Sequence, residues 1–274
     1  MRCTSVAAAR TFEVSEAAHD HIFGVQISGS GNVVSADRRL RLWGLATAYA
    51  DSGPVTVGHV CAAANSATVT DGAAIAVALT ATPRETIYSS DRTASEIEEL
   101  SLTLGEGPCV DALAGGLVLV PDLGTAQSSA RWPAFAPAAV AAGAQAIFAL
   151  PLQVGAIRLG VLDLYRTGPG ELDHEQGLDA LMLADTACAL LLDAGSPSSA
   201  RIPEPASLQH PEVHQATGMI SVQLGLSAAL ALVRLRAYAY VHNRRLRDVS
   251  RDVVTRRLRF NPESSSSNGQ SEGD

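Results

Sequence analysis

Apolar residues recur at steps of three and four near the C-terminal end of the chain, a spacing typical of amphipathic helices. The first helix is predicted to begin near Glu212, directly after Pro211, and to end at Gly225, because glycine tolerates the left-handed conformation that closes many helices. Ser227 is a suitable N-cap for a second helix. The apolar positions of the three predicted helices are Val213, Ala216, Ile220 and Leu224, then Ala231, Leu232, Leu235 and Ala239, then Leu246, Val249, Val253 and Leu258. Helices this short need neighbours for stability, so residues 209–260 are predicted to form one three-helix unit.

The preceding part of the chain mixes strand and helix patterns. Two runs separated by Pro83-Arg84 predict a β-hairpin, and three further runs predict additional strands. The predicted strands are Ala73–Thr80, Glu85–Ser89, Leu117–Val120, Ala146–Gln153 and Arg158–Tyr165. The predicted helices include one capped by Ser35, one ending at Gly105, one over Trp132–Ala142 and one following Leu172-Asp173. Helices packed on a mostly antiparallel sheet predict an α+β fold for residues 35–194.

Shifts in composition set the remaining boundaries. Residues 1–34 hold a Gly/Ser run without a sustained apolar pattern, so we expect a disordered N-terminal segment, and the start of translation is an open question near Val33 or Val34. Residues 195–208 are rich in Pro and Ser and predict a semi-extended linker. Residues 261–274 are rich in Ser and predict a disordered tail. No window offers about 20 uninterrupted apolar residues, so we expect no membrane span and a cytoplasmic location.

Charge is distributed unevenly along the chain. All 20 basic residues are arginine, and nine of them lie within residues 209–260 beside three acids. This segment carries a net charge of +6, whereas the rest of the chain carries −14 and the whole chain −8. Three acids cannot pair with nine arginines, so a positive field remains around the three-helix unit. A basic helical segment on an acidic protein indicates contact with a polyanion.

The C-terminal residues also resemble a known family. The matching positions are Gln215-Ala-Thr-Gly-Met-Ile220, then Ser227, Ala231, Leu235, Arg236 and Ala239, then Asn243, Leu246, Val249, Ser250 and Val253. Their order and spacing resemble the ANTAR domain, the RNA-binding output module of transcription antitermination regulators. Thr217 departs from the pattern, because many members carry a lysine there. The departure removes the charge that one phosphate contact would use and leaves the helix pattern unchanged.

The larger domain carries a second set of matching segments. They are Leu104–Cys109, Val120–Leu123, Ala149–Leu152, Leu159–Leu162 and Leu172-Asp173. In this order they resemble a GAF domain, a sensory fold that bacteria place upstream of output modules. Together the two parts resemble the GAF–ANTAR regulators of actinobacteria, and arginine without lysine beside abundant Ala and Gly fits a GC-rich genome.

The resemblance implies that the C-terminal unit contacts RNA. The predicted contacts are Thr217, Arg236, Tyr240, Arg244, Arg245, Arg247 and Arg251. Guanidinium groups pair with phosphates, and tyrosine rings, of Tyr238 as well as Tyr240, offer stacking surfaces for unpaired bases or else pack in the core. Arg236 has a structural alternative, a hydrogen bond to a helix end or to another helix. The predicted core motif is Ala216, Gly218, Ala231, Leu235 and Ala239, with Gly218 expected to permit close helix approach.

The sequence points to no catalytic or metal chemistry. The four cysteines, Cys3, Cys61, Cys109 and Cys188, are dispersed without a CxxC pair, so free buried thiols are expected. Residues 105–109 lack the lysine and hydroxyl residue of a phosphate loop, and a tight loop beside a pocket is expected instead. A redox role for Cys109 lacks a basic neighbour in the sequence. We therefore predict no catalytic residue, no metal ligand and no cofactor.

These features predict a signal-responsive regulator that acts by binding. The resemblance implies recognition of paired stem-loops in a nascent leader RNA, which excludes a competing terminator hairpin. Two stem-loops imply a homodimer, and the apolar faces of Leu40–Tyr49 and Leu178–Leu192 either pair protomers or cover the sheet. The signal is an unidentified small molecule or protein, and neither the target transcripts nor the direction of coupling follows from the sequence.

The alternative is a DNA-binding transcriptional regulator with a sensory domain. Residues 244–259 are basic and fit a helical pattern, as a recognition helix would. Against this alternative, the most specific part of the family pattern lies in the first helix of the unit.

Overall fold

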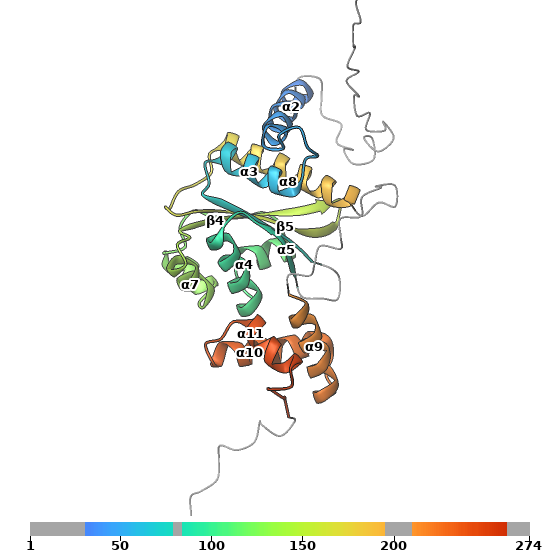
Figure 1. Cartoon of the computed structure of the whole chain (residues 1–274). Coiled ribbons are helices and arrows are strands. Elements are labelled where there is room, and N and C mark those ends of the chain that lie inside the picture. Colours follow the sequence, from blue (N-terminus) through green and yellow to red (C-terminus); the bar gives the residue numbers. More distant parts are fainter. Residues whose placement is uncertain (1–30, 79–83, 195–209, 262–274) are drawn as a thin grey trace, which may run out of the picture. The chain divides into compact units, whose positions relative to one another are not determined.

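The computed structural model describes residues 31–78, 84–194 and 210–261 (Figure 1). The chain forms two compact units, Met1–Arg38 and Arg39–Asp274. The second unit contains the sheet and the C-terminal helices. The predicted linker and nearly all of the two predicted disordered ends lie outside the described residues.

Five antiparallel strands form one sheet in the order β2-β1-β5-β4-β3. The strands are β1 (Gly72–Val77), β2 (Glu85–Ser89), β3 (Val118–Val120), β4 (Ala146–Val154) and β5 (Ile157–Arg166). Two hairpins, β1–β2 and β4–β5, join where β1 pairs with β5, for example at Ile75 opposite Leu162. The predicted α+β fold is confirmed, and each predicted strand appears close to its expected bounds.

Helices cover both faces of this sheet and complete what we call the sheet domain (residues 39–194). Its helices are α2 (Gly31–Tyr49), α3 (Val57–Thr68), α4 (Arg92–Leu104), α5 (Pro108–Gly115), α6 (Ala126–Arg131), α7 (Phe135–Ala141) and α8 (His174–Ala194). Figure 1 shows α3 and α8 on one face and α4 and α5 on the other. Leu42 and Ala46 of α2 belong to the same hydrophobic cluster as buried residues of α3 and α8.

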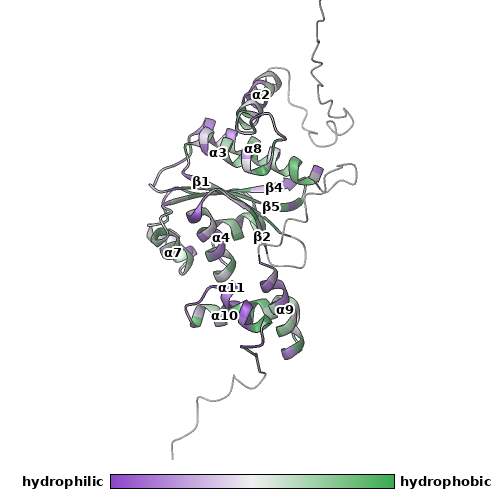
Figure 2. Cartoon of the chain, viewed as in Figure 1, coloured by the Kyte–Doolittle hydropathy of each residue, from purple (hydrophilic) through white to green (hydrophobic). Residues whose placement is uncertain are grey.

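Alternation along the strands assigns side chains to the two faces. Ile75 and Phe148 pack on the side of α3 and α8, whereas Val161 and Tyr165 of β5 pack on the side of α4 and α5. Asp163 stands between these last two in the strand and shares their face, where it is 5% exposed. Strand β5 therefore brings one buried acid to the face that α4 and α5 cover. Figure 2 shows strands mainly in white and green.

The C-terminal part is a three-helix unit with its own core. Its helices are α9 (Pro211–Leu224), α10 (Ala228–Val241) and α11 (Leu246–Val254). Gly225 ends α9 with a φ of 64°, as predicted. Ser227 is the N-cap of α10, also as predicted, and its Oγ accepts a hydrogen bond from the Leu230 N–H at 3.4 Å. The core residues are Val213, Ala216, Ile220, Ala231, Leu235, Ala239, Leu246, Val249 and Val253, together with Leu102 of α4.

Three local predictions were wrong. Helix α2 begins at Gly31, so Ser35 lies inside the helix and does not cap it. Residues 105–107 form the tight connection that was expected, but α5 begins at Pro108 with proline in its first turn, so Cys109 lies in a helix and not in the loop. The third C-terminal helix ends at Val254, so Leu258 and the arginines around it lie beyond it.

No single helix among the described residues combines the length and apolarity needed to span a membrane. Helices α9 and α10 meet that requirement only as a pair, and they are bent by 105° at the break between them. The longest helix, α8, has 21 residues and packs against the sheet.

Gly160 tests the β1–β5 pairing. A Cβ at Gly160 would lie 2.2 Å from the Ala76 carbonyl oxygen, a backbone atom of the neighbouring strand. We expect Gly160→Ala to lower the free energy of unfolding by about 1–3 kcal/mol in urea denaturation, because the strands must separate. Gly177→Ala in α8 is the matched control, since its Cβ would meet nothing within 4 Å. The free energy of unfolding of the control is expected to rise by about 0.5–1 kcal/mol. Equal stability of the two variants would contradict the pairing.

Candidate nucleic-acid interface

Alanine lets the three C-terminal helices pack closely. Ala216, Ala231, Leu235 and Ala239, four of the five predicted core-motif residues, are fully buried. Gly218, the fifth, is exposed, and a Cβ there would meet nothing within 4 Å. Gly218 therefore does not mediate helix approach, contrary to the prediction. It opens the outer face of α9 instead.

The chain turns back toward α9 after α11. Arg256 has a φ of 60°, an uncommon conformation for a non-glycine residue, and it ends the helical path. The N–H groups of Arg257 and Leu258 both donate to the Asp252 carbonyl, at 2.8 and 3.0 Å. The Phe260 N–H then donates to Gln223 Oε1 of α9 at 3.0 Å. These bonds place the arginines of residues 256–259 beside the first helix.

A groove of about 660 Å³ lies between α9 and this returning segment. Its lining residues are Gln215, Gly218, Met219, Val222, Gln223, Arg256 and Arg259. The glycine and the exposed Val222 offer an apolar floor, two glutamine amides offer hydrogen bonds, and two guanidinium groups stand at the edge. A flat heterocycle attached to a phosphate fits this combination, because its face needs an apolar support and its phosphate a cation.

Most of the predicted arginine contacts form surface ion pairs. Arg244 pairs with Asp252 at 2.7 Å, and Arg251 lies 3.5 Å from Asp248. Arg247 lies 3.9 Å from the same Asp248 carboxylate. Exposed pairs of this kind contribute about 0–1 kcal/mol, so a phosphate can replace the acid at little cost. These arginines are available to a polyanion, but each starts from a competing contact.

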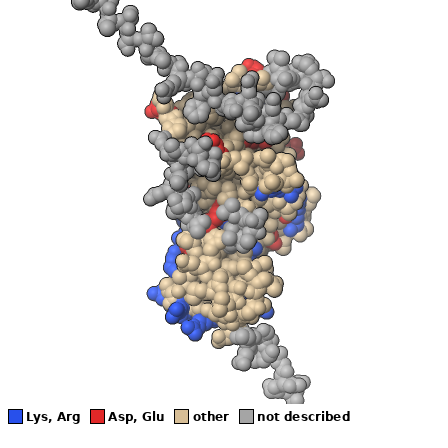
Figure 3. All heavy atoms as spheres, turned by 90° about the vertical axis from the view of Figure 1, so that its right-hand side faces the viewer, with Lys and Arg blue, Asp and Glu red and all other residues tan. Residues whose placement is uncertain are grey.

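Four other arginines form no side-chain ion pair or hydrogen bond within the described residues. They are Arg234, Arg256, Arg257 and Arg259. The seven predicted RNA contacts include none of the four, although the excess of nine arginines over three acids was a signal for them. Figure 3 shows blue arginine atoms gathered at the lower end of the view. Without an acidic partner these arginines add more positive field to this surface than the paired ones do.

The remaining predicted contacts differ in accessibility. Tyr240 is 61% exposed and offers a free ring face. Tyr238 instead stacks on His242, with ring centroids 3.9 Å apart, and meets the edge of Phe260. Thr217 is 5% exposed and its hydroxyl donates to the Val213 carbonyl at 2.7 Å, so the structure does not present it to a ligand. The reason is its position four residues after Val213, on the buried face of α9.

The family model for the ANTAR domain matches residues 206–254. The C-terminal unit is an ANTAR domain. Curated proteins provide no match to this chain. The ANTAR match ends at the last residue of α11, so the returning segment with Arg256 and Arg259 lies just beyond it.

The sheet domain resembles the GAF fold in its five-stranded antiparallel sheet and its helices, in agreement with the predicted GAF–ANTAR arrangement. One solved relative is the GAF domain of a phosphoenolpyruvate-protein phosphotransferase from Coxiella burnetii, with 15% identity and a TM-score of 0.44 over 58% of this chain and 96% of that chain. Another is the free methionine-R-sulfoxide reductase of Neisseria meningitidis, with 18% identity and a TM-score of 0.38 over 63% and 96%. At these scores neither structure informs the function of this chain.

Helix α4 of the sheet domain binds the ANTAR domain through several polar contacts. Arg236 Nε donates to the Leu102 carbonyl at 2.8 Å, and Arg245 Nη2 donates to Glu96 Oε1 at 2.9 Å. The Leu246 N–H donates to Thr103 Oγ1 at 3.3 Å. Burial lowers the pKa of Arg236, and the neighbouring charge of Arg84 lowers it further. Arg236 therefore makes the hydrogen bond to another helix that was the structural alternative to an RNA contact. Arg245 is held by Glu96 at the edge of the ANTAR domain.

Histidines of α9 and its N-cap add a second set of contacts to the same surface. His214 contacts the Glu85 carboxylate of β2, and His210 Nε2 lies 3.7 Å from Glu99 Oε2 of α4. Burial raises the pKa of the Glu99 carboxyl, partly offset by the charges of His210 and Arg247. No local sequence pattern indicates these pairs, because their members lie more than a hundred residues apart.

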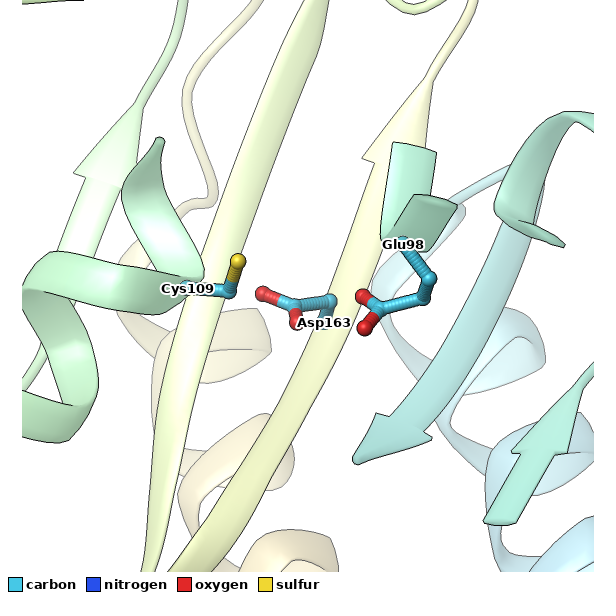
Figure 4. Close-up of side chains that lie close together, drawn as sticks. All are labelled: Glu98, Cys109 and Asp163. Carbon is cyan, nitrogen blue, oxygen red and sulfur yellow. The ribbon is translucent and has the colours of Figure 1, made fainter. Parts of the chain in front are cut away.

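A buried polar cluster lies inside the sheet domain, between α4, α5 and β5. Figure 4 shows the Asp163 carboxylate between the Cys109 thiol and the Glu98 carboxylate. Arg84 Nη1 donates to Cys109 Sγ at 2.7 Å, and Arg84 Nη2 lies 3.2 Å from Glu98 Oε2. Cys109 thus has the basic neighbour that the sequence did not show. Cys61, Cys109 and Cys188 are free and buried, as predicted, and Cys3 lies outside the described residues.

Burial dominates the ionisation of this cluster. It raises the pKa of the Cys109 thiol to about 12, although the Arg84 charge acts in the opposite direction. It also raises the pKa of the Asp163 carboxyl well above its usual range, and the nearby Glu98 charge adds to the effect. For Arg84, burial alone lowers the pKa, but Cys109, Glu98 and Asp163 together raise it. A protonated thiol is a poor nucleophile, so this site does not favour a redox reaction at Cys109.

Arg236 and Arg234 provide a matched test of the contact with α4. They lie two residues apart on α10, but only Arg236 is held by the Leu102 carbonyl. We expect Arg236→Ala to lower the free energy of unfolding by about 1.5–3 kcal/mol, because it removes a charge-assisted bond and leaves a carbonyl without its donor. Arg234→Ala is expected to change it by less than about 0.5 kcal/mol. Urea denaturation of both full-length variants measures the difference, and equal effects would show that the bond contributes nothing.

Proposed function

We propose that this protein is a transcription antitermination regulator whose ANTAR domain binds stem-loops of a nascent leader RNA. The observation that carries the proposal is the groove on α9, where an apolar floor and two amides lie beside Arg256 and Arg259. Arginine pairs with the RNA backbone, and an unpaired loop base enters the groove. The unpaired Arg234 and Arg257 extend the positive surface.

The shape of the unit favours loop RNA over duplex DNA. A recognition helix enters the major groove of DNA as one continuous helix. Here α11 has nine residues and ends at Val254, and the free arginines that follow lie in a non-helical segment. Residues 244–259 therefore do not form the single basic helix on which the DNA-binding alternative rested.

The protein acts in this proposal by binding and without a catalytic step. Its affinity for one RNA structure over another shifts the folding equilibrium of the transcript, so the terminator hairpin does not form. The GAF-like sheet domain receives the signal, an unidentified small molecule or protein. Its control over RNA binding runs through α4, which holds Arg236 and Arg245 of the ANTAR domain. A target on a nascent bacterial transcript places the protein in the cytoplasm.

A target with two stem-loops is matched by two copies of this chain. Helix α8 packs against the sheet, α2 adds buried residues to the same hydrophobic cluster, and both helices also carry large apolar side chains that are exposed. The exposed side chains include Leu40, Trp43, Tyr49, Leu178, Leu181 and Leu192. Helix α8 covers the sheet and still carries exposed apolar side chains, and we propose the exposed apolar side chains of α2 and α8 as the dimer contact.

The arginines at the groove test RNA binding directly. We expect the full-length protein to prefer a two-stem-loop RNA over duplex DNA of equal length in competition binding. Arg256→Ala and Arg259→Ala should each weaken RNA binding and reduce the slope of log K against log salt by roughly 0.7–0.9, because each removes one phosphate contact. Arg131→Ala on α6, which removes the same charge from the sheet domain, is the control and should leave both quantities unchanged. A preference for duplex DNA would move the DNA-binding alternative to first place.

Gly218 tests whether a base occupies the groove. Gly218→Ala adds a methyl group to open space within a helix, so it is expected to raise the free energy of unfolding by up to about 1 kcal/mol. The same methyl group stands on the groove floor and should weaken RNA binding by about 1–3 kcal/mol, or roughly 5- to 150-fold in Kd. Gly177→Ala in α8 is the control. Unchanged RNA affinity in the stable Gly218→Ala variant would place the bound base elsewhere.

A further inference from the structure

We propose that Glu98, Cys109 and Asp163 form a binding site for a divalent transition metal of borderline softness, Zn²⁺ or Fe²⁺, inside the sheet domain. The three residues come from α4, α5 and β5 and meet in the layer between helices and sheet (Figure 4). One ligand atom from each residue lies within 4.8 Å of the others.

The spacing is close to what such a metal requires. Metal–sulfur bonds of about 2.3 Å and metal–oxygen bonds of about 2.0–2.2 Å place tetrahedral ligand atoms roughly 3.5 Å apart. Side-chain movements of about 1 Å around the present positions close that difference, since each carboxylate can turn about its side-chain torsions. Three protein ligands leave a fourth position for water, the arrangement typical of open metal sites.

The Asp163 carboxylate is the observation that points to a ligand. Its side chain is 5% exposed, and within the described part of the chain no N–H or hydroxyl group donates to either of its oxygens. Glu98 is 2% exposed, and its Oε1 likewise accepts no hydrogen bond. A buried carboxylate without donors is unstable unless a proton or a cation neutralises it.

A small cavity beside these carboxylates limits the size of the ligand. It borders Glu98 and Asp163 and has a volume of about 10 Å³. A space of about 10–15 Å³ holds one water molecule. The cavity has room for one water-sized ligand, such as a water molecule bound to the ion, whereas a nucleotide or another organic effector does not fit.

The charges around the site match a divalent ion. Arg84 supplies one positive charge, so full ionisation of the thiol and the two carboxyl groups leaves two negative charges for a divalent ion. When the metal binds, the ligands lose their protons to solvent, the Cys109 thiol proton among them, and metal–ligand bonds form in their place. Three anionic ligands, one divalent ion and Arg84 are then neutral together. Arg84 remains as the hydrogen-bond donor to the sulfur, an outer-shell role common at metal sites.

The ligand set also restricts the kind of metal. Mg²⁺ and Ca²⁺ prefer oxygen ligands throughout, and Cu⁺ prefers sulfur. One thiolate with two carboxylates suits Zn²⁺ and Fe²⁺, which accept both kinds of donor.

Metal binding would act on the helix that holds the ANTAR domain. Glu98 lies on α4 between Glu96, which pairs with Arg245, and Leu102, whose carbonyl accepts from Arg236. The charge of Arg84 lowers the pKa of Arg236. A change of charge at the metal site therefore also acts on Arg236. This coupling rests on the proposed RNA-binding function, whereas the metal site itself does not.

Cobalt provides a direct test on the full-length protein. The apo protein is titrated anaerobically with Co²⁺, and we expect one Co²⁺ per chain with a near-ultraviolet thiolate-to-cobalt charge-transfer band. The Cys3→Ser/Cys61→Ser/Cys188→Ser variant keeps only Cys109 and should retain the band. Cys109→Ser should lose it, and Asp163→Asn should weaken binding by at least roughly tenfold, with circular dichroism confirming that each variant folds. Competition with Zn²⁺ and, separately, with Fe²⁺ identifies the preferred ion.

Two results would overturn the site: no stoichiometric Co²⁺ binding, or a band that survives Cys109→Ser. RNA affinity measured with and without one equivalent of metal then tests the coupling. A change of severalfold or more supports it, and an unchanged affinity refutes the coupling while leaving the site in place. If the protein binds no RNA at all, the proposed function fails, but the cobalt spectrum still decides the metal site.

Discussion

The carboxyl end of helix α4 is where the sheet domain and the ANTAR domain meet, and its hydrogen bonding determines how they join. The last carbonyl groups of a helix have no donors within the helix, and burying them without donors is costly. Arg236 satisfies the Leu102 carbonyl, while Gly105 ends the helix with a φ of 71°. A Cβ at Gly105 would lie 3.0 Å from Arg236 Nη1, so glycine serves both the backbone turn and the approach of the guanidinium. The Leu102 side chain enters the ANTAR core from the same turn.

The strands and helices could be predicted because their signals are local. Gly225 and Ser227 mark a helix end and a helix start by their own conformational preferences, and the apolar spacing identifies the buried faces. The burial of Thr217 could also have been predicted from the sequence. Thr217 lies four residues after Val213 and three before Ile220, so helical periodicity alone places it in the core. The family pattern indicated a ligand contact from the residue type at this position, whereas the position of Thr217 on the helix places it on the buried face.

The rest of the site depends on contacts that no local pattern encodes. The end of α11 could not be foreseen, because Arg256 adopts a left-handed conformation that its residue type disfavours. That turn is what brings Arg256 and Arg259 to the groove on α9. The buried cluster depends in the same way on strand register. Asp163 reaches the side of α4 and α5 only because β5 pairs with β1 and β4 in a register that turns it inward, and a shift of one residue would reverse its face.

The composition of the sheet domain makes the buried cluster harder to explain as a device for stability. Its core consists largely of alanine, valine and leucine. Replacing a buried group of ions by apolar side chains of similar volume is often neutral or stabilising. Here the group also sets two acids against one arginine and contains carboxylate oxygens without donors. In the proposed site a bound cation would supply the contacts that these oxygens lack, and its binding would then act on α4 and β5. A site whose stability changes with occupancy, on the helix that holds Arg236 and Arg245, has the physical properties that a sensor coupled to an RNA-binding domain requires.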